Sequence, residues 1–175
     1  ILMHFTLRPK KGDKILDFIE DLMGRKEFTK ALEIISEQEK QPTNDRKFRH
    51  MLEEHKKYCA FGIVTGNYEM ATKCFTEARY QEASKLYKEL SESITDGIEI
   101  FNIERDTLNV FLGEVARELE RSGPTIAMKD VKPLRNRLKE MIAEKFKDEL
   151  QASLFEMLAD CYIGSAVSKA VANPT

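Results

Sequence analysis

Apolar residues recur every three or four positions along almost the whole chain, and few residues interrupt the pattern. The 175 residues include only eight Gly and five Pro. A period near 3.6 is typical of amphipathic α-helices, and Gly and Pro are the residues that most often end them. The sequence therefore predicts an all-α fold: antiparallel helical hairpins stacked as a short solenoid, or an irregular bundle of about six to seven helices.

Short breaks divide the first half of the chain into predicted helices. We expect helices over 13–23 and 27–39, with Gly24 ending the first and Pro42 interrupting the chain after the second. A third helix is expected over 45–64. Gly66-Asn67 is predicted to turn the chain into a fourth, which begins at Tyr68 and continues to about residue 91. The faces expected to be buried in the first two helices are Ile15, Phe18, Ile19 and Leu22, and Phe28, Ala31, Leu32 and Ile35.

The second half shows the same periodicity with clearer stops. A fifth helix is expected over 95–121, ended by the sequence Ser-Gly-Pro-Thr at 122–125. Lys132-Pro133 predicts a helix that carries proline in its first turn, and a last helix is expected over 154–172. We expect residues 1–92 to form a region of helical hairpins and residues 93–175 to pack on it or cap it, as one structural unit.

Charge and composition exclude some function classes. The chain has 28 Lys and Arg against 30 Asp and Glu, a formal charge of -2, so no overall field favours nucleic acid or membrane. The basic-rich stretch over 129–147 is interleaved with acidic residues, which predicts a solvent-exposed helix face. No run of 18 apolar residues occurs, so the sequence predicts no membrane-spanning helix.

The cysteines indicate the redox compartment of the protein, and the first residue bears on whether the chain is a fragment. Cys59, Cys74 and Cys161 are widely spaced and odd in number, which predicts reduced thiols in the core of a cytoplasmic or nuclear protein. The chain begins with Ile rather than Met. We therefore expect it to be a fragment of a larger protein.

The segment over 66–78 is the most informative part of the sequence. Its Gly-Asn pair permits a tight turn, and Tyr68, Ala71, Phe75 and Ala78 then follow at offsets that share one helix face. Small residues on such a face allow a neighbouring helix to approach closely. Aromatic residues fill the remaining space.

These residues resemble the tetratricopeptide repeat, a helix-turn-helix unit of about 34 residues. Gly66, Tyr68, Ala71, Phe75 and Ala78 match its turn and second helix, and an upstream echo occurs at Phe28, Ala31 and Ile35. The preceding helix departs from the pattern, with His55, Tyr58 and Gly62 at positions usually held by Trp, Leu and an aromatic residue. A further echo, at Tyr80, Ala83 and Tyr87, follows too soon for another hairpin and is interpreted as a continuation of the fourth helix. The resemblance covers residues 13–92.

The resemblance implies a protein-protein interaction module, an adaptor, scaffold or regulatory domain that binds a protein or peptide. Family members bind partners mainly on the first helix of each hairpin. The corresponding residues are Glu53, Lys56, Ala60, Ile63 and Val64. Lys56 would receive an acidic group or a C-terminal carboxylate.

Residues 4–38 carry a rival resemblance, to ribbon-helix-helix repressors of the Arc type. In that family a short strand pairs across a dimer and enters the DNA major groove. The resemblance implies that His4, Thr6 and Arg8 contact bases. The near-neutral charge of the segment disfavours DNA binding, so this function is the alternative.

Motifs for catalysis or cofactor binding do not occur in the sequence. We find no phosphate-binding glycine loop, metalloprotease motif or nucleophile elbow. His50 and Glu54 share a helix face, but His4 and His55 do not join them as metal ligands would. The sequence therefore predicts a non-enzymatic protein without catalytic, cofactor-binding or metal-binding residues.

Overall fold

The computed structural model describes residues 11–126 and 131–172 and confirms the all-α class. Within these ranges the chain forms seven α-helices and one short 3-10 helix, η1, with no strand. Two compact units divide between residues 63 and 64, so α3 contributes to both. The helices are α1 (Lys11–Gly24), α2 (Phe28–Glu39), α3 (Arg46–Thr76), α4 (Tyr80–Asp96), η1 (Ile98–Phe101), α5 (Arg105–Ile126), α6 (Lys132–Lys145) and α7 (Glu149–Ala172).

The first unit packs the α1–α2 hairpin against the beginning of α3. Gly12 faces Phe48, and Glu20 contacts His55 about two turns further along both helices, so α1 and α3 run parallel. Phe18 was expected in this core, but 52% of it is exposed, because it lies at the edge of the apolar stripe of α1. The buried residues of the core are Ile19, Leu22, Ala31, Ile35, Leu52 and Cys59.

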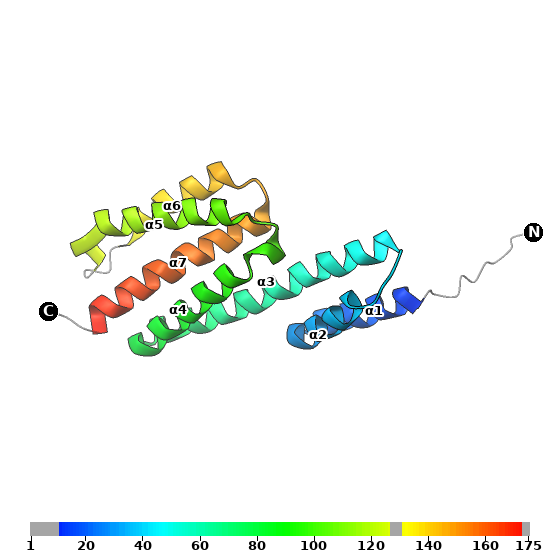
Figure 1. Ribbon diagram of the computed structural model, residues 1–175. Helices are drawn as coiled ribbons and strands as arrows, with labels where there is room; N and C mark the ends of the chain where they lie inside the picture. The colour runs from blue at the N-terminus through cyan, green and yellow to red at the C-terminus, as the bar shows by residue number, and fades with distance from the viewer. Residues whose placement is uncertain (1–10, 127–130, 173–175) are drawn as a thin grey trace, which may run out of the picture. The chain divides into compact units, whose positions relative to one another are not determined.

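In the second unit, α7 is the central helix. It lies between α4 on one side and α5 and α6 on the other (Figure 1). A helix that contacts neighbours on several sides needs apolar residues around most of its circumference. Its sequence meets this need with ten buried residues, among them Phe155, whose ring contacts those of Phe111 and Phe146 at centroid distances of 4.7 and 4.0 Å.

The predicted turn at Gly66-Asn67 is wrong, because α3 continues through both residues as one helix (Figure 1). Neither residue has a positive φ. A glycine inside a helix costs only about 1 kcal/mol relative to alanine. The apolar face on both sides of the pair outweighs this cost, since Cys59, Val64 and Ala71 are all buried.

The chain turns instead at residues 77–79. The interpretation of Tyr80, Ala83 and Tyr87 as a continuation of the preceding helix is therefore also wrong, since they lie on α4, the second helix of a hairpin. Ala78 takes the left-handed conformation, with φ 61°. A turn made by Ala lacks the Gly or Asn signal that usually marks such a position.

Two expected boundaries in the second half also differ. The helix predicted over 95–121 is interrupted. α4 extends to Asp96, and the short helix η1 follows it. Asn102, with φ 57°, ends η1 before α5 begins. The expected stop at 122–125 is wrong, since α5 continues to Ile126. Ser122 is buried there and accepts a hydrogen bond from Arg137 Nη2 at 3.4 Å, so packing against α6 favours the helix. The predicted start of α6 at Lys132-Pro133 is confirmed.

Candidate interaction surfaces

The five residues predicted to contact a partner all lie on α3, in different environments. Glu53 is exposed, while Ala60 and Ile63 are half-buried. Lys56 Nζ forms an ion pair with Glu39 Oε1 of α2 at 3.1 Å. Val64 is only 6% exposed. The structure therefore brings Glu53 and Lys56 onto the side of α3 that meets the end of α2, and it places Val64 in the interior.

A hollow of about 100 Å³ opens in the first unit beside Glu53. Its two charged α3 residues, Arg49 and Glu53, are exposed and one helical turn apart. Among the described residues neither forms an ion pair, so both can bind an incoming polar group. We call this site the α2–α3 hollow; its lining residues are Gln38, Glu39, Gln41, Thr43, Arg49, Leu52 and Glu53.

The beginning of α3 is held in place by its own cap. Asp45 Oδ1 accepts a hydrogen bond from the Phe48 backbone N–H at 3.1 Å, and Thr43 Oγ1 accepts one from the Asp45 N–H at 3.1 Å. Such caps satisfy backbone donors that have no partner within the helix. The cap fixes the loop that forms one wall of the α2–α3 hollow.

A larger groove, of about 230 Å³, lies between α3 and α4 in the second unit. Met70 of α3 is 56% exposed at this groove, and Leu86 and Leu90 of α4 line it as well. Among the described residues that line it, Glu89 alone is charged. We call this site the α3–α4 groove; its lining residues are Asn67, Met70, Leu86, Glu89, Leu90 and Ser93.

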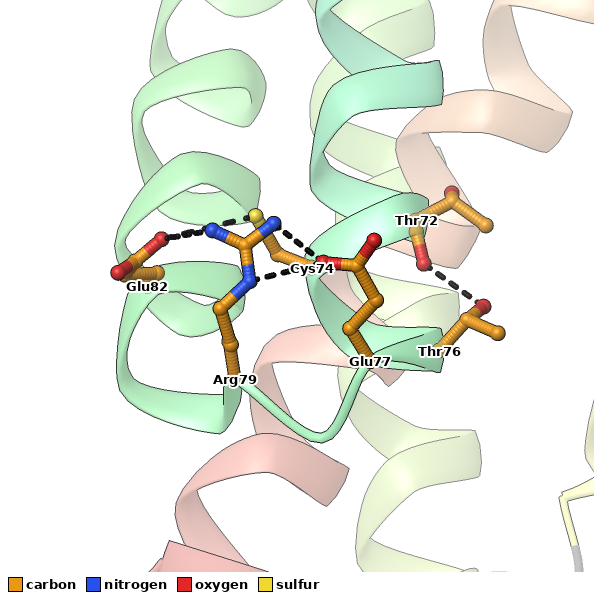
Figure 2. A network of polar contacts seen from close by, with 6 residues as sticks. All are labelled: Thr72, Cys74, Thr76, Glu77, Arg79 and Glu82. Atoms are coloured by element: carbon orange, nitrogen blue, oxygen red, sulfur yellow. Dashed lines mark hydrogen bonds and ion pairs between the residues drawn. The ribbon is translucent and has the colours of Figure 1, made fainter.

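A polar network holds the α3–α4 hairpin closed at its turn. Figure 2 shows the guanidinium of Arg79 between Glu77 and Glu82, with nitrogen-oxygen distances of 2.7 Å to each carboxylate. The Cys74 thiol lies 3.8 Å from Glu82 Oε2, and Thr76 Oγ1 donates to the Thr72 carbonyl at 2.9 Å. These charges are engaged with one another, which indicates a structural role.

A second network links α3, α6 and α7. The Tyr68 hydroxyl donates to Asp160 Oδ2 at 2.7 Å, and Arg135 Nε donates to Asp160 Oδ1 at 3.0 Å. Burial, followed by the hydrogen bond to Asp160, raises the pKa of Tyr68 above its usual value. Tyr68 therefore remains a neutral donor near pH 7 and fixes α3 against α7.

The cysteines lie where the sequence predicted them, in the interior. Cys59, Cys74 and Cys161 are free and at most 3% exposed. Burial raises the pKa of the Cys59 thiol to about 11 and that of Cys161 to about 12. Because the thiolate is the reactive form, these two thiols are poor nucleophiles near pH 7.

No group of three His, Cys, Asp or Glu side chains in residues 11–126 and 131–172 is arranged to hold a metal ion. The helices in these ranges are not long and apolar enough to cross a membrane.

The predicted DNA contacts, His4, Thr6 and Arg8, lie outside the described residues, so DNA binding stays a prediction.

No known family model, curated protein or solved structure matches the chain.

The sequence-based prediction missed two surface residues, Arg49 and Met70. For Met70 a signal was present: residues 26–35 and 78–87 share a pattern that places the turn at Ala78, and this turn puts Met70 on the helix that precedes α4.

Proposed function

We propose that this chain is a non-enzymatic protein-interaction module built from helical hairpins, which resemble those of the tetratricopeptide repeat but recur after 52 rather than about 34 residues. It acts as an adaptor, scaffold or regulatory domain and binds a protein or peptide segment at the α2–α3 hollow. The contact residues are Glu53 and its neighbour Arg49, which line the hollow, and contacts extend further along α3 to the aliphatic part of Lys56 and the half-buried Ala60 and Ile63.

The observation that carries this proposal is a hairpin turn that occurs twice, 52 residues apart. The left-handed residues are Lys26 and Ala78, with φ 60° and 61°. An aromatic residue, a buried alanine and a large apolar residue follow each turn at the same offsets. These sets are Phe28, Ala31 and Ile35 after the first turn and Tyr80, Ala83 and Tyr87 after the second.

The backbone hydrogen bonds of the two turns also correspond. In each, the left-handed residue bonds the carbonyl three positions back and the next residue bonds the carbonyl five positions back. The bonds are Lys26 to Met23 and Glu27 to Leu22, at 3.0 and 2.9 Å, and Ala78 to Phe75 and Arg79 to Cys74, at 3.1 and 2.9 Å. Recurrence of one supersecondary unit is the property of repeat proteins, which commonly bind other proteins through surfaces between their helices.

Two charges of the α2–α3 hollow support a polar or peptide ligand, those of Arg49 and Glu53, which form no ion pair with the residues that the structure describes. Arg49 can donate two parallel hydrogen bonds to a carboxylate, and Glu53 can accept from a backbone or side-chain N–H. Lys56 was expected to bind the carboxylate, but its charge is already satisfied by Glu39. Arg49 therefore takes that role in the proposal.

Site-specific photocrosslinking tests the proposed function. A photoreactive residue replaces Gln41, which is exposed and lines the hollow but is not a proposed contact, in the full-length protein within its own cells. The crosslinked proteins are then identified. The control places the same group at Lys30, which is on α2 outside the hollow and has a side chain that is 68% exposed. We expect a reproducible partner from position 41 that position 30 does not capture. Equal capture at both positions, or none at either, would contradict the proposal.

A further inference from the structure

We propose that the α3–α4 groove binds an amphipathic helix of a partner protein, one that presents large aliphatic side chains flanked by lysine or arginine. This inference rests on the proposed interaction function and adds a second surface and the chemistry of its ligand. It follows from three properties of the groove: its size, the apolar residues among its lining and the acidic charge on α4.

The size of the groove suits side chains rather than a complete small molecule. Its volume is about 230 Å³, below the roughly 300–1,000 Å³ of typical small-molecule sites. A groove between two antiparallel helices is also the usual surface on which a third helix packs its ridge of side chains. The expected ligand is therefore a helix that inserts a few side chains while the rest of it stays outside.

Three of the residues that line the groove are apolar, of which Met70 and Leu86 are accessible and Leu90 is buried. Met70 is a flexible side chain with 56% exposure, a type of residue that adapts to different aliphatic partners. Leu86 and Leu90, one turn apart on α4, form the opposite wall. Large aliphatic residues at helical spacing are the groups that such grooves select.

Acidic residues on α4 favour a cationic flank on the ligand. Glu89 lines the middle of the groove, and Asp96 lies seven residues later on the same side of α4, beyond the lining residue Ser93. The last turn of α4 contains no basic residue, so the negative end of its dipole is not compensated within the helix. Lys85 approaches Glu89 only to 3.9 Å, and both side chains are largely exposed. A lysine or arginine of the ligand would interact favourably with this end.

Peptide selection tests the inference directly. A displayed library of random peptides of about 15 residues, long enough to form a helix, is selected on the purified chain. We expect enriched peptides with aliphatic residues three and four positions apart and with nearby Lys or Arg. Met70→Asp should weaken their binding by about tenfold, and Glu89→Lys by several-fold with a smaller dependence on salt.

The matched control is Val110→Asp, because Val110 is 55% exposed in the same unit but does not line the groove. This variant should bind the peptides as the unchanged chain does. The inference is overturned if the enriched peptides are acidic, if Met70→Asp binds them normally, or if the enriched peptides match only helices of this chain, which would indicate self-association. If these results occur while crosslinking at position 41 still recovers a partner, the groove assignment fails and the proposed function stands.

Discussion

At the scale of single residues, two helical glycines lie against aromatic rings. A Cβ atom added at Gly62 would lie 2.5 Å from Phe28 Cε2, and one added at Gly164 would lie 2.5 Å from Tyr87 Cε2. Real Cβ atoms do not approach other carbons so closely. Each ring belongs to the second helix of a hairpin, and each glycine lies on a later helix. The two contacts therefore set how closely neighbouring helices pack within their own units.

Replacing either glycine by alanine should destabilise the protein. Gly62→Ala and Gly164→Ala are expected to lower the free energy of unfolding by about 1–3 kcal/mol, because the added methyl group forces the ring to move. Urea denaturation followed by circular dichroism measures the change. The control is Gly113→Ala, also in a helix but with no atom within 4 Å, which should gain about 0.5–1 kcal/mol. Equal effects at all three positions would refute the close contacts.

The buried thiols predict how stability depends on pH. Burial raises the pKa of Cys59 and Cys161 from 9.0 to about 11 and 12, whereas in the unfolded chain they keep ordinary values. Their contribution to stability is therefore complete below pH 9 and is lost as the pH rises through 11 and 12. Denaturation curves at rising pH should show this loss, and thiol labelling should be slow in the folded protein. Rapid labelling at pH 8 without denaturant would show that the thiols are accessible.

At the scale of elements, the sequence predicted where helices form better than where they turn. The α1–α2 hairpin and the start of α6 are close to prediction, because Gly24 and Pro133 are strong local signals. The turn between α3 and α4 has no such signal. Its left-handed residue is Ala78, and the stronger local signal, Gly66-Asn67, is overridden by tertiary packing of α3.

The continuity of α3 can be tested at Gly66. Gly66 is helical, exposed and without atoms within 4 Å of an added Cβ. Gly66→Ala should therefore stabilise the protein by about 0.5–1 kcal/mol, through a smaller entropy loss on folding. Thermal and urea denaturation measure the difference. A loss of stability would instead indicate that residue 66 requires a glycine conformation, as a turn there would.

At the left-handed residues of the two hairpin turns, Lys26 and Ala78, glycine is expected to increase stability. Lys26→Gly and Ala78→Gly should each stabilise the protein by about 0.5–1 kcal/mol, because a left-handed conformation costs a residue with Cβ roughly 1–2 kcal/mol. Ala83→Gly is the control, since Ala83 is buried within α4 and should lose stability on the same change. If glycine destabilises positions 26 and 78 as well, the repeated turn is not present in solution.

At the scale of the whole molecule, the sequence predicted the fold class but only part of the candidate surfaces. Periodicity identifies which apolar residues share one face of a helix, but it does not show which neighbouring helix covers that face. Val64 was expected at the surface and is buried, while Met70 is exposed at a groove that depends on the position of α4. Likewise, the pairing of Lys56 with Glu39 joins residues 17 positions apart, which local patterns do not reveal.

The most direct test of the interaction function is the affinity of the purified chain for the partner recovered through position 41. Isothermal titration calorimetry would compare the unchanged chain with Glu53→Arg and Lys30→Glu. We predict saturable binding that Glu53→Arg weakens by about tenfold, because it removes the carboxylate that accepts from an N–H of the ligand at the α2–α3 hollow, and that Lys30→Glu leaves unchanged. Absence of binding by the unchanged chain, or equal binding by Glu53→Arg, would contradict the account.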